Sequence, residues 1–262
     1  MPTKVVILCG GLGTRLKEET EIKPKPMVTI GDKPILWHIM KIYAHYGFKD
    51  FILCLGYKGG VIKEYFLNYD ILNSDFTIKL GQKKTVTVHN TSDESDWSVT
   101  LADTGVSALK GARLKKIEKY IKEDSFMVTY GDGVGNINVN KLLDFHRSHG
   151  KIATVTGVRA PSRFGELQVK GMQALIFAEK PQSSSGGLIN GGFFIFNKVF
   201  FDYLTSDDSC DFEKGPLEKI ANEGQLMVYT HEGDWACMDT LRDVEYLNGL
   251  WQNNEAFWKV WR

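Results

Sequence analysis

The 262-residue sequence lacks several features that would narrow its function at once. It has no formal net charge, because 32 basic residues balance 32 acidic ones, and this argues against a general affinity for nucleic acid or for an anionic membrane surface. No apolar run approaches the roughly 18 residues that a membrane-spanning helix needs. We therefore expect neither a nucleic-acid partner nor a membrane partner.

Cysteine is scarce, and the four cysteines are widely spaced with no C-x-x-C pair among them. Two of the four, Cys9 and Cys54, stand inside apolar runs, so we expect buried free thiols rather than a disulfide framework or a zinc site. No secretory hydrophobic segment precedes the first predicted strand, which favours a cytoplasmic location. The six histidines show no H-x-x-x-H spacing, so His146 and His149 are weak zinc candidates.

What the sequence does contain is an alternation of strand and helix signals. Four short apolar runs, rich in β-branched or aromatic residues, predict strands that are covered on both faces, at residues 5–9, 51–55, 126–130 and 152–158. Amphipathic patterns predict helices from about Ile35 to Gly47 and from Lys141 to Gly150. The predicted fold class is α/β, with a Rossmann-like, mostly parallel, doubly wound sheet.

Two regions depart from this alternation. Residues 74–98 contain alternating polar and apolar positions and a polar loop, which predict a small antiparallel β insertion beside the main sheet. Residues 165–262 begin with strand-like runs separated by a Ser/Gly turn, and we interpret them as a C-terminal part that binds sugar. No linker divides the chain, so we expect one domain over residues 1–262.

The first chemical feature is the run KVVILCGGLGTRL from Lys4 to Leu16, followed by PKPM. The glycines at 10, 11 and 13 allow backbone N–H groups to approach a polyphosphate, and the start of the next helix would add a partial positive charge. Arg15 and Lys25 add full charges, so the pattern favours a nucleoside triphosphate. A P-loop needs Lys-Ser or Lys-Thr directly after its last glycine, and no such pair follows these glycines. A dinucleotide-binding loop needs G-x-G-x-x-G, and counted from Gly11 the last glycine place is occupied by Leu16. A turn without a ligand and a nicotinamide-binding domain stay open as alternatives.

The second chemical feature is a pair of acidic residues in glycine- and helix-start contexts. Asp132 lies in TYGDG at the end of a predicted strand, and Asp239 lies in MDTLRD, where Thr240 and Asp243 have capping-box spacing. Mg²⁺ prefers oxygen ligands and usually takes one or two protein carboxylates, with water and phosphate oxygens completing its shell. The pair predicts a Mg²⁺ site. Each acid alone is equally well explained as a turn or helix-start residue.

These motifs together resemble the sugar-phosphate nucleotidyltransferases. The matching segments follow the order of that family over nearly the whole chain: GGLGTRL, PKPM, KPILWHIM, TYGDG, RFG, EKP, INGGFF, MDTLRD and WKVW. The resemblance implies a Mg²⁺-dependent transfer of a nucleotidyl group to a sugar 1-phosphate with release of pyrophosphate. Within the family the likeness is greatest to the branch that joins CTP and glucose 1-phosphate into CDP-glucose.

The resemblance also assigns residues. Arg15 and Lys25 would be catalytic, and Asp132 and Asp239 would hold the metal. Nucleotide binding would use Leu8, Cys9, Gly10, Gly11, Leu12, Gly13, Thr14, Arg15, Lys25, Arg113 and Gly131. The sugar phosphate would contact Glu179, Lys180, Asn190 and Gly191. The family's usual TGGR reads KGAR here, with Lys110 and Ala112 departing, which leaves the assignment of Arg113 open.

Three functional classes follow from this reading. The first is a CTP-dependent transferase acting on glucose 1-phosphate, the second is a sister enzyme that uses dTTP, UTP or another hexose phosphate, and the third is a silent domain that binds nucleotide sugars. The family habit of symmetric assembly implies a homo-oligomer. The aromatic C-terminal segment, which includes Trp251, Trp258 and Trp261, is expected to serve packing or a subunit contact rather than nucleic-acid stacking.

Overall fold

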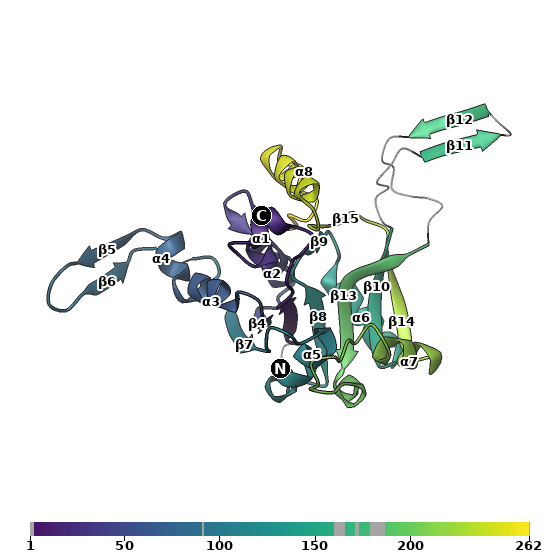
Figure 1. Ribbon diagram of the computed structural model, residues 1–262, viewed down its shortest axis with the longest axis horizontal. Coiled ribbons are helices and arrows are strands. Elements are labelled where there is room, and N and C mark those ends of the chain that lie inside the picture. The colour runs from purple at the N-terminus through teal and green to yellow at the C-terminus, as the bar shows by residue number, and fades with distance from the viewer. Residues whose placement is uncertain (1–2, 91, 160–165, 171–172, 179–186, 262) are drawn as a thin grey trace.

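The computed structural model describes residues 3–90, 92–159, 166–170, 173–178 and 187–261. Its main sheet has seven strands in the order β14-β10-β13-β8-β1-β4-β7 (Figure 1). In that order they span Leu226–His231, Ala153–Val158, Ile189–Asn197, Ser125–Tyr130, Val5–Cys9, Asp50–Leu55 and Ser98–Asp103. Strand β13 runs antiparallel to β10 and β8, whereas the other neighbouring pairs are parallel. The predicted mostly parallel α/β sheet is confirmed.

Strand β1 lies in the middle of this sheet and is buried along its whole length. Val5, Ile7 and Cys9 face one hydrophobic cluster, and the alternate residues Val6 and Leu8 face a second cluster. Successive side chains of a strand point to opposite faces, so a strand covered on both sides needs apolar residues at every position. This is why the uninterrupted run VVILC forms the central strand.

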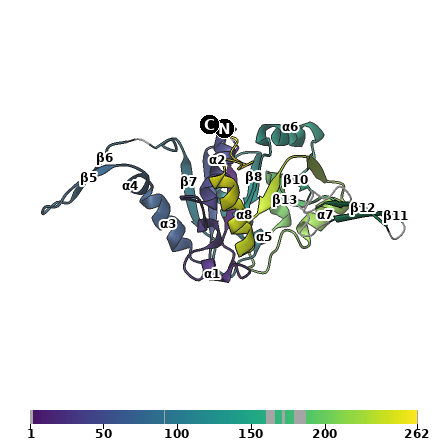
Figure 2. The ribbon, with the colours of Figure 1, turned by 90° about the horizontal axis from the view of Figure 1, so that it is seen from above.

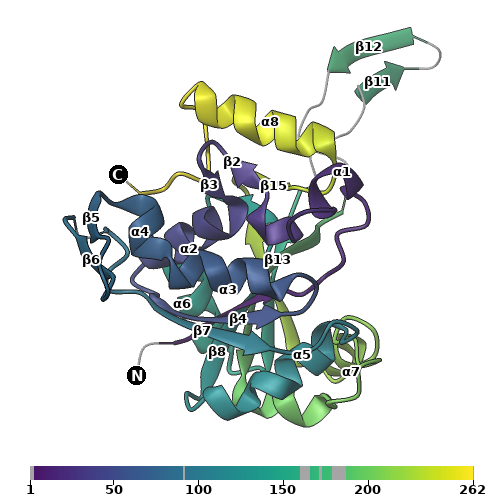
Figure 3. The same cartoon turned by 60° about the vertical axis from the view of Figure 1, so that its left-hand side comes forward.

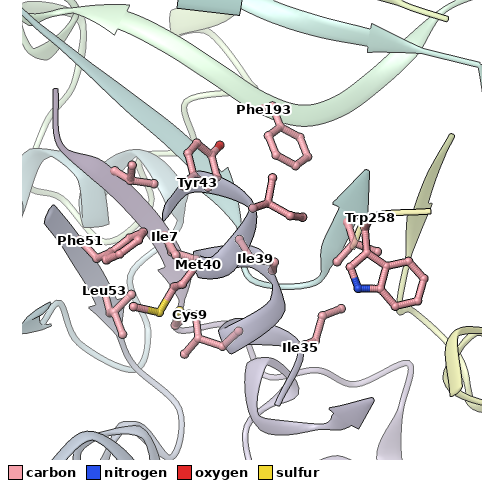
Figure 4. Close-up of a cluster of buried hydrophobic side chains, with 14 of the residues drawn as sticks. Ile7, Cys9, Ile35, Ile39, Met40, Tyr43, Phe51, Leu53, Phe193 and Trp258 are labelled. Carbon is pink, nitrogen blue, oxygen red and sulfur yellow. The ribbon is translucent and has the colours of Figure 1, made fainter. Parts of the chain in front are cut away.

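Helices cover both faces of the sheet. The first cluster receives side chains from α2 (Ile35–His45), α6 (Val139–His149) and α8 (Leu241–Gln252), and Figure 4 shows Ile39 and Met40 of α2 gathered there with Ile7. Side chains from α5 (Lys110–Ile117), α7 (Pro216–Asn222) and the 3-10 helix η3 (Lys198–Tyr203) belong to the second cluster. The two helices predicted from sequence are therefore present, and Gly150 ends α6 in the left-handed conformation.

An arm projects from one end of the sheet (Figures 1 and 2). It consists of α3 (Gly59–Leu67), α4 (Tyr69–Asn73) and a hairpin of β5 (Phe76–Lys79) with β6 (Thr85–Val88). The two strands of the hairpin are antiparallel and form a sheet of their own, separate from the main sheet, as expected for an insertion at 74–98. Residue Ser98 already belongs to β7 of the main sheet.

The remaining elements are short. They are α1 (Lys17–Thr20), η1 (Lys25–Met27), β2 (Thr29–Ile30), β3 (Lys33–Pro34), η2 (Glu118–Tyr120), β9 (Gly133–Gly135), β11 (Glu166–Lys170), β12 (Gln173–Ala178) and β15 (Trp235–Cys237). Strands β11 and β12 pair antiparallel, while most of the predicted Ser/Gly turn lies outside the described residues. Among the helices that the structure describes, none has the length and apolar character needed to cross a bilayer.

The C-terminal segment folds back onto elements from the first fifth of the chain. Helix α8 lies over the β2–β3 turn, where the Asn248 Oδ1 atom accepts a hydrogen bond of 2.9 Å from the Gly31 N–H (Figure 3). Trp258 is fully buried, and its indole N–H donates to His38 of α2. The predicted packing role of the aromatic residues is confirmed within one chain.

Candidate active site

The loop after β1 opens into a cavity of about 500 Å³ at the carboxyl ends of β1 and β8. Ligands in open α/β sheets gather at this edge. The cavity is lined by most of the predicted site residues: Leu8, Cys9, Gly10, Gly11, Gly13, Thr14, Arg15, Lys25, Arg113, Gly131, Asp132, Asn190, Gly191 and Asp239. Leu12 is 55 % exposed and is not part of the lining, and Glu179 and Lys180 lie outside the described residues.

Backbone pairing brings the two predicted metal ligands together. Asp132 directly precedes β9, and Asp239 follows β15 after one residue. The two strands pair antiparallel with Cys237 opposite Gly133, and the Met238 N–H donates to the Asp132 carbonyl oxygen at 2.8 Å. Two acids that are 107 positions apart in sequence are thus held at adjacent points of one ladder.

A single lysine lies between the two carboxylates. The Lys25 Nζ atom is 2.6 Å from Asp132 Oδ2 and 2.5 Å from Asp239 Oδ1. The Arg15 Nη1 atom is 2.7 Å from Asp239 Oδ2, and the Arg15 side chain is 71 % exposed. Both predicted cations and both predicted acids therefore meet in one cluster at the mouth of the glycine loop.

The charges in this cluster stabilise one another. Burial lowers the pKa of the Lys25 ammonium, but the Asp132 and Asp239 carboxylates outweigh that effect, so the pKa of Lys25 lies above its ordinary value. Burial raises the pKa of Asp239, but Lys25 and then Arg15 outweigh it, so the pKa of Asp239 lies below its ordinary value. Lys25 and Asp239 are consequently ionised at neutral pH.

The predicted capping box fixes Asp239. The Thr240 hydroxyl accepts from the Asp243 N–H, and the Asp243 carboxylate accepts from the Thr240 N–H at 2.8 Å. The same carboxylate also accepts from the Asp239 N–H at 3.0 Å. The start of α8 therefore holds the backbone of the second acid, a role for Asp243 that the capping pattern alone did not indicate.

Arg113 is buried and binds the glycine loop. Its guanidinium donates to the Gly10 carbonyl oxygen at 2.9 Å and to the Thr104 hydroxyl at 2.8 Å. It also donates to backbone oxygens of Leu55, Gly105 and Val106. A Cβ atom on Gly10 would lie 2.0 Å from the Arg113 guanidinium, so this glycine makes room for the arginine. The expected contact between Arg113 and substrate stays a prediction.

The expectation of a helix dipole at this loop needs correction. The helix that follows the glycine loop, α1, has only four residues. A macrodipole requires a longer stack of aligned peptide units, so α1 contributes little charge to a phosphate site. The positive potential of the loop comes from the Arg15 and Lys25 side chains instead.

Four further cavity residues form a hydrogen-bonded network, of which only Asn190 was predicted to be a site residue. Glu213 bonds the Tyr130 hydroxyl and the Lys110 ammonium, and the Asn190 amide donates to Glu213 Oε1 at 3.2 Å. Lys110 was noticed in sequence as the first residue of KGAR. No local pattern marks Glu213, because its partners are distant in sequence.

The donor set fits Mg²⁺. Asp132 and Asp239 supply two hard carboxylate ligands on one side of the cavity, and a cationic group already lies at the point where they converge. Within the described part of the chain, no three histidine, cysteine or acidic side chains are grouped as an all-protein metal cage would require. His146 and His149 instead bond the Thr154 hydroxyl. The fit is to an ion that shares its shell with phosphate.

Known proteins resemble this chain over nearly its whole length. Residues 4–258 match the family described as nucleotidyl transferase. The glucose-1-phosphate cytidylyltransferases of Salmonella typhimurium and Salmonella typhi are each 51 % identical to the chain, over 98 % of it and 99 % of each relative. A UDP-glucose pyrophosphorylase solved with UDP-glucose has a TM-score of 0.69 at 14 % identity, with 97 % of this chain and 100 % of that chain covered. The last likeness concerns the fold, whereas the family match and the full-length relatives establish that the chain belongs to the nucleotidyl transferase family.

Proposed function

We propose that the chain transfers the cytidylyl group of CTP to α-D-glucose 1-phosphate, giving CDP-glucose and pyrophosphate. The observation that carries this proposal is the full-length likeness to glucose-1-phosphate cytidylyltransferases, combined with a cavity in which Lys25 and Arg15 meet Asp132 and Asp239. A domain that only binds nucleotide sugars would not need this charged cluster.

The reaction is a displacement at phosphorus. An oxygen of the sugar phosphate forms a bond to the α-phosphorus of CTP, and the bond from that phosphorus to the β-phosphate bridging oxygen breaks, releasing pyrophosphate. At about 4 Å, two unit charges repel by roughly 4 kcal/mol at an effective dielectric of 20, so cations must offset the meeting of two anions. The attacking phosphate is already ionised, and no general base is required.

We assign each residue a role in this displacement from its position in the charged cluster. Lys25, held deepest in the cluster, would stabilise charge at the α-phosphorus, and Arg15 at the exposed mouth would hold the leaving pyrophosphate. Asp132 and Asp239 would hold Mg²⁺. When bound, the metal supplies Lewis-acid stabilisation of phosphate oxygens. The residues of the glycine loop that line the cavity, with Arg113 and Gly131, would form the nucleotide side.

The sugar side belongs to the second half of the chain. Asn190 and Gly191 line the same cavity as the predicted metal ligands Asp132 and Asp239. The Trp235 indole N–H donates to the Gly191 carbonyl oxygen at 2.8 Å. From the sequence motif EKP we add Glu179 and Lys180, with Lys180 positioning the attacking phosphate. We propose one nucleotidyltransferase domain over residues 1–262, with residues 165–262 as its sugar-binding and C-terminal part.

A pyrophosphate-release assay tests the reaction. The protein is incubated with Mg²⁺, glucose 1-phosphate and each of CTP, UTP, dTTP and GTP in turn, and CTP is expected to give the highest kcat/KM. Higher turnover with UTP or dTTP, or with another hexose 1-phosphate, would move the chain to the sister-enzyme alternative. No release with any combination would favour the silent binding domain.

The metal assignment has its own test. Asp132→Asn and Asp239→Asn each remove one anionic ligand, so the Mg²⁺ concentration that gives half-maximal activity is expected to rise by about tenfold or more for each variant. The control is Asp144→Asn, a residue of α6 outside the cavity. An unchanged Mg²⁺ dependence in the first two variants would remove these residues as ligands.

We also propose that the chain forms a homo-oligomer. The arm exposes large apolar side chains, with Leu67, Leu72 and Leu80 at 79 %, 62 % and 86 % exposure, and a second copy of the chain would cover such a surface. Light scattering is expected to give a mass that is a multiple of one chain. A single-chain mass at micromolar concentration would contradict this.

A further inference from the structure

The Asn190 side chain is held at both ends of its amide. Its Oδ1 atom accepts a hydrogen bond of 2.8 Å from the Gly192 N–H. Its Nδ2 atom donates to Glu213 Oε1 at 3.2 Å and to the Tyr130 hydroxyl oxygen at 3.3 Å. The Tyr130 hydroxyl and Glu213 Oε1 are bonded to each other, so they lie on the same side of the Asn190 nitrogen and share one of its two hydrogens. One lone pair of Oδ1 and the second amide hydrogen are therefore left for a ligand.

Glu213 holds this orientation from the nitrogen end of the amide, and the Gly192 N–H holds it from the oxygen end. An ionised carboxylate only accepts, so the Tyr130 hydroxyl must donate to Glu213, and its oxygen is then available to accept from Asn190. Without an anion at position 213, the Asn190 amide keeps the hydrogen bond from the Gly192 N–H but loses its charged partner at the nitrogen.

Lys110 holds Glu213 from its other oxygen. The Lys110 ammonium pairs with Glu213 Oε2, while Oε1 receives Tyr130 and Asn190, so the two carboxylate oxygens have separate partners. Lys110 also lies 3.4 Å from Asp211 Oδ1. All four members of the network line the same cavity as Lys25 and the two predicted metal ligands, and their bonds run to Asn190. The network therefore forms the wall that a sugar would face.

Resting on the proposed function, we infer that Glu213 is a positioning residue for the hexose, which together with the Gly192 N–H holds the Asn190 amide so that Oδ1 accepts a hydrogen bond from one sugar hydroxyl. A site that offers an acceptor at a fixed place selects a hexose with a hydroxyl at that place and rejects an epimer that lacks it. Glu213 thus sets discrimination among hexose 1-phosphates without touching the phosphates.

The decisive variant is Glu213→Gln, which keeps the size of the side chain and removes its charge. A neutral amide can donate as well as accept and carries no charge, so it holds the Tyr130 hydroxyl and the Asn190 nitrogen less firmly than a carboxylate does. We expect the KM for glucose 1-phosphate to rise at least about tenfold, with the KM for CTP and kcat within about threefold of the wild type. The preference for glucose 1-phosphate over galactose 1-phosphate is expected to fall in parallel.

The matched control is Asp208→Asn. Asp208 forms another ion pair between this segment and α5, at 2.7 Å from Lys116 Nζ, and it does not line the cavity. Its kinetic constants are expected to match those of the wild type. A second variant, Tyr130→Phe, removes the hydroxyl between Glu213 and Asn190 and is expected to shift the same KM in the same direction.

The outcomes separate a positioning role from a structural one. A selective rise in the KM for the sugar phosphate, with an unchanged melting temperature, supports the inference. An unchanged KM in Glu213→Gln overturns it, as does an equal rise in both KM values or the same shift in Asp208→Asn. Wild-type inactivity with CTP would contradict the proposed nucleotide instead, and the hexose comparison is then made with the triphosphate that gives the highest turnover.

Discussion

At the scale of single residues, the position of Lys25 decides the chemistry. The ammonium is within 2.6 Å of both acids that would hold the metal, so any phosphate bound there must lie next to it. A fixed cation in a site of reduced solvent access stabilises developing charge more than it would in water. Arg15, by contrast, is mostly exposed and suits a group that leaves.

We therefore predict that Lys25→Ala lowers kcat by at least about 100-fold, because the cation nearest the reacting phosphorus is lost. Steady-state pyrophosphate release measures this. The control is Lys23→Ala, a nearby lysine that pairs with Glu19 and does not line the cavity. A kcat within a few fold of the wild type for Lys25→Ala would show that this lysine serves the structure rather than the reaction.

At the scale of elements, helix α5 anchors the glycine loop through Arg113. Five oxygen acceptors surround the guanidinium, and they come from the ends of β1, β4 and the segment after β7. One buried arginine thus joins three strand ends at this edge of the sheet. The glycine at position 10 is needed for this packing as well as for close approach to a ligand.

From this packing we predict that Gly10→Ala lowers the melting temperature by roughly 4–8 °C, because displacing Arg113 breaks buried charged hydrogen bonds worth about 2 kcal/mol. Thermal unfolding followed by circular dichroism measures this. Gly11→Ala is the matched control, since a Cβ atom at that position meets nothing within 4 Å. Equal melting temperatures for the two variants would be evidence against the packing role of Gly10.

The elements also show which parts of the fold and of the site could be predicted from the sequence. Strands β1, β4, β8 and β10 were predicted to within about two residues because each is an apolar run buried on both faces. The meeting of Asp132 and Asp239 was predicted from strand-end positions, although the β9–β15 pair that holds them carries no sequence signal. Glu213 escaped notice because its contacts with Lys110 and Tyr130 join residues 103 and 83 positions apart. Such pairings depend on tertiary topology, which local patterns do not encode.

At the scale of the whole molecule, the fold is closed by contacts between α2 and the C-terminal aromatic segment. His38 is fully buried, and its ring lies against Trp37, Trp251, Trp258 and Trp261. Its Nε2 atom donates to the Ile30 carbonyl oxygen at 3.0 Å, so Nδ1 must accept from the Trp258 indole. Only the neutral ring satisfies both bonds, and burial lowers the pKa of His38 to about 4.

This pKa predicts acid sensitivity. Because the unfolded chain takes up a proton near pH 6.5 and the folded chain does so only near pH 4, the free energy of unfolding falls between these values by on the order of 3 kcal/mol from His38. Urea unfolding at pH 7.5 and pH 5 measures the loss. The comparison is His38→Gln, which is expected to lose less stability between the two pH values. The same loss in both proteins would contradict the role of His38.

The pairing of α2 with residues from the far end of the chain also has a consequence for synthesis. Trp258 is 220 positions after His38, so the part of α2 that packs against the C-terminal tryptophans stays uncovered while the ribosome is still making the chain between them. Nascent intermediates with such a face are prone to aggregate, and they are natural clients for chaperones until translation reaches the tryptophans.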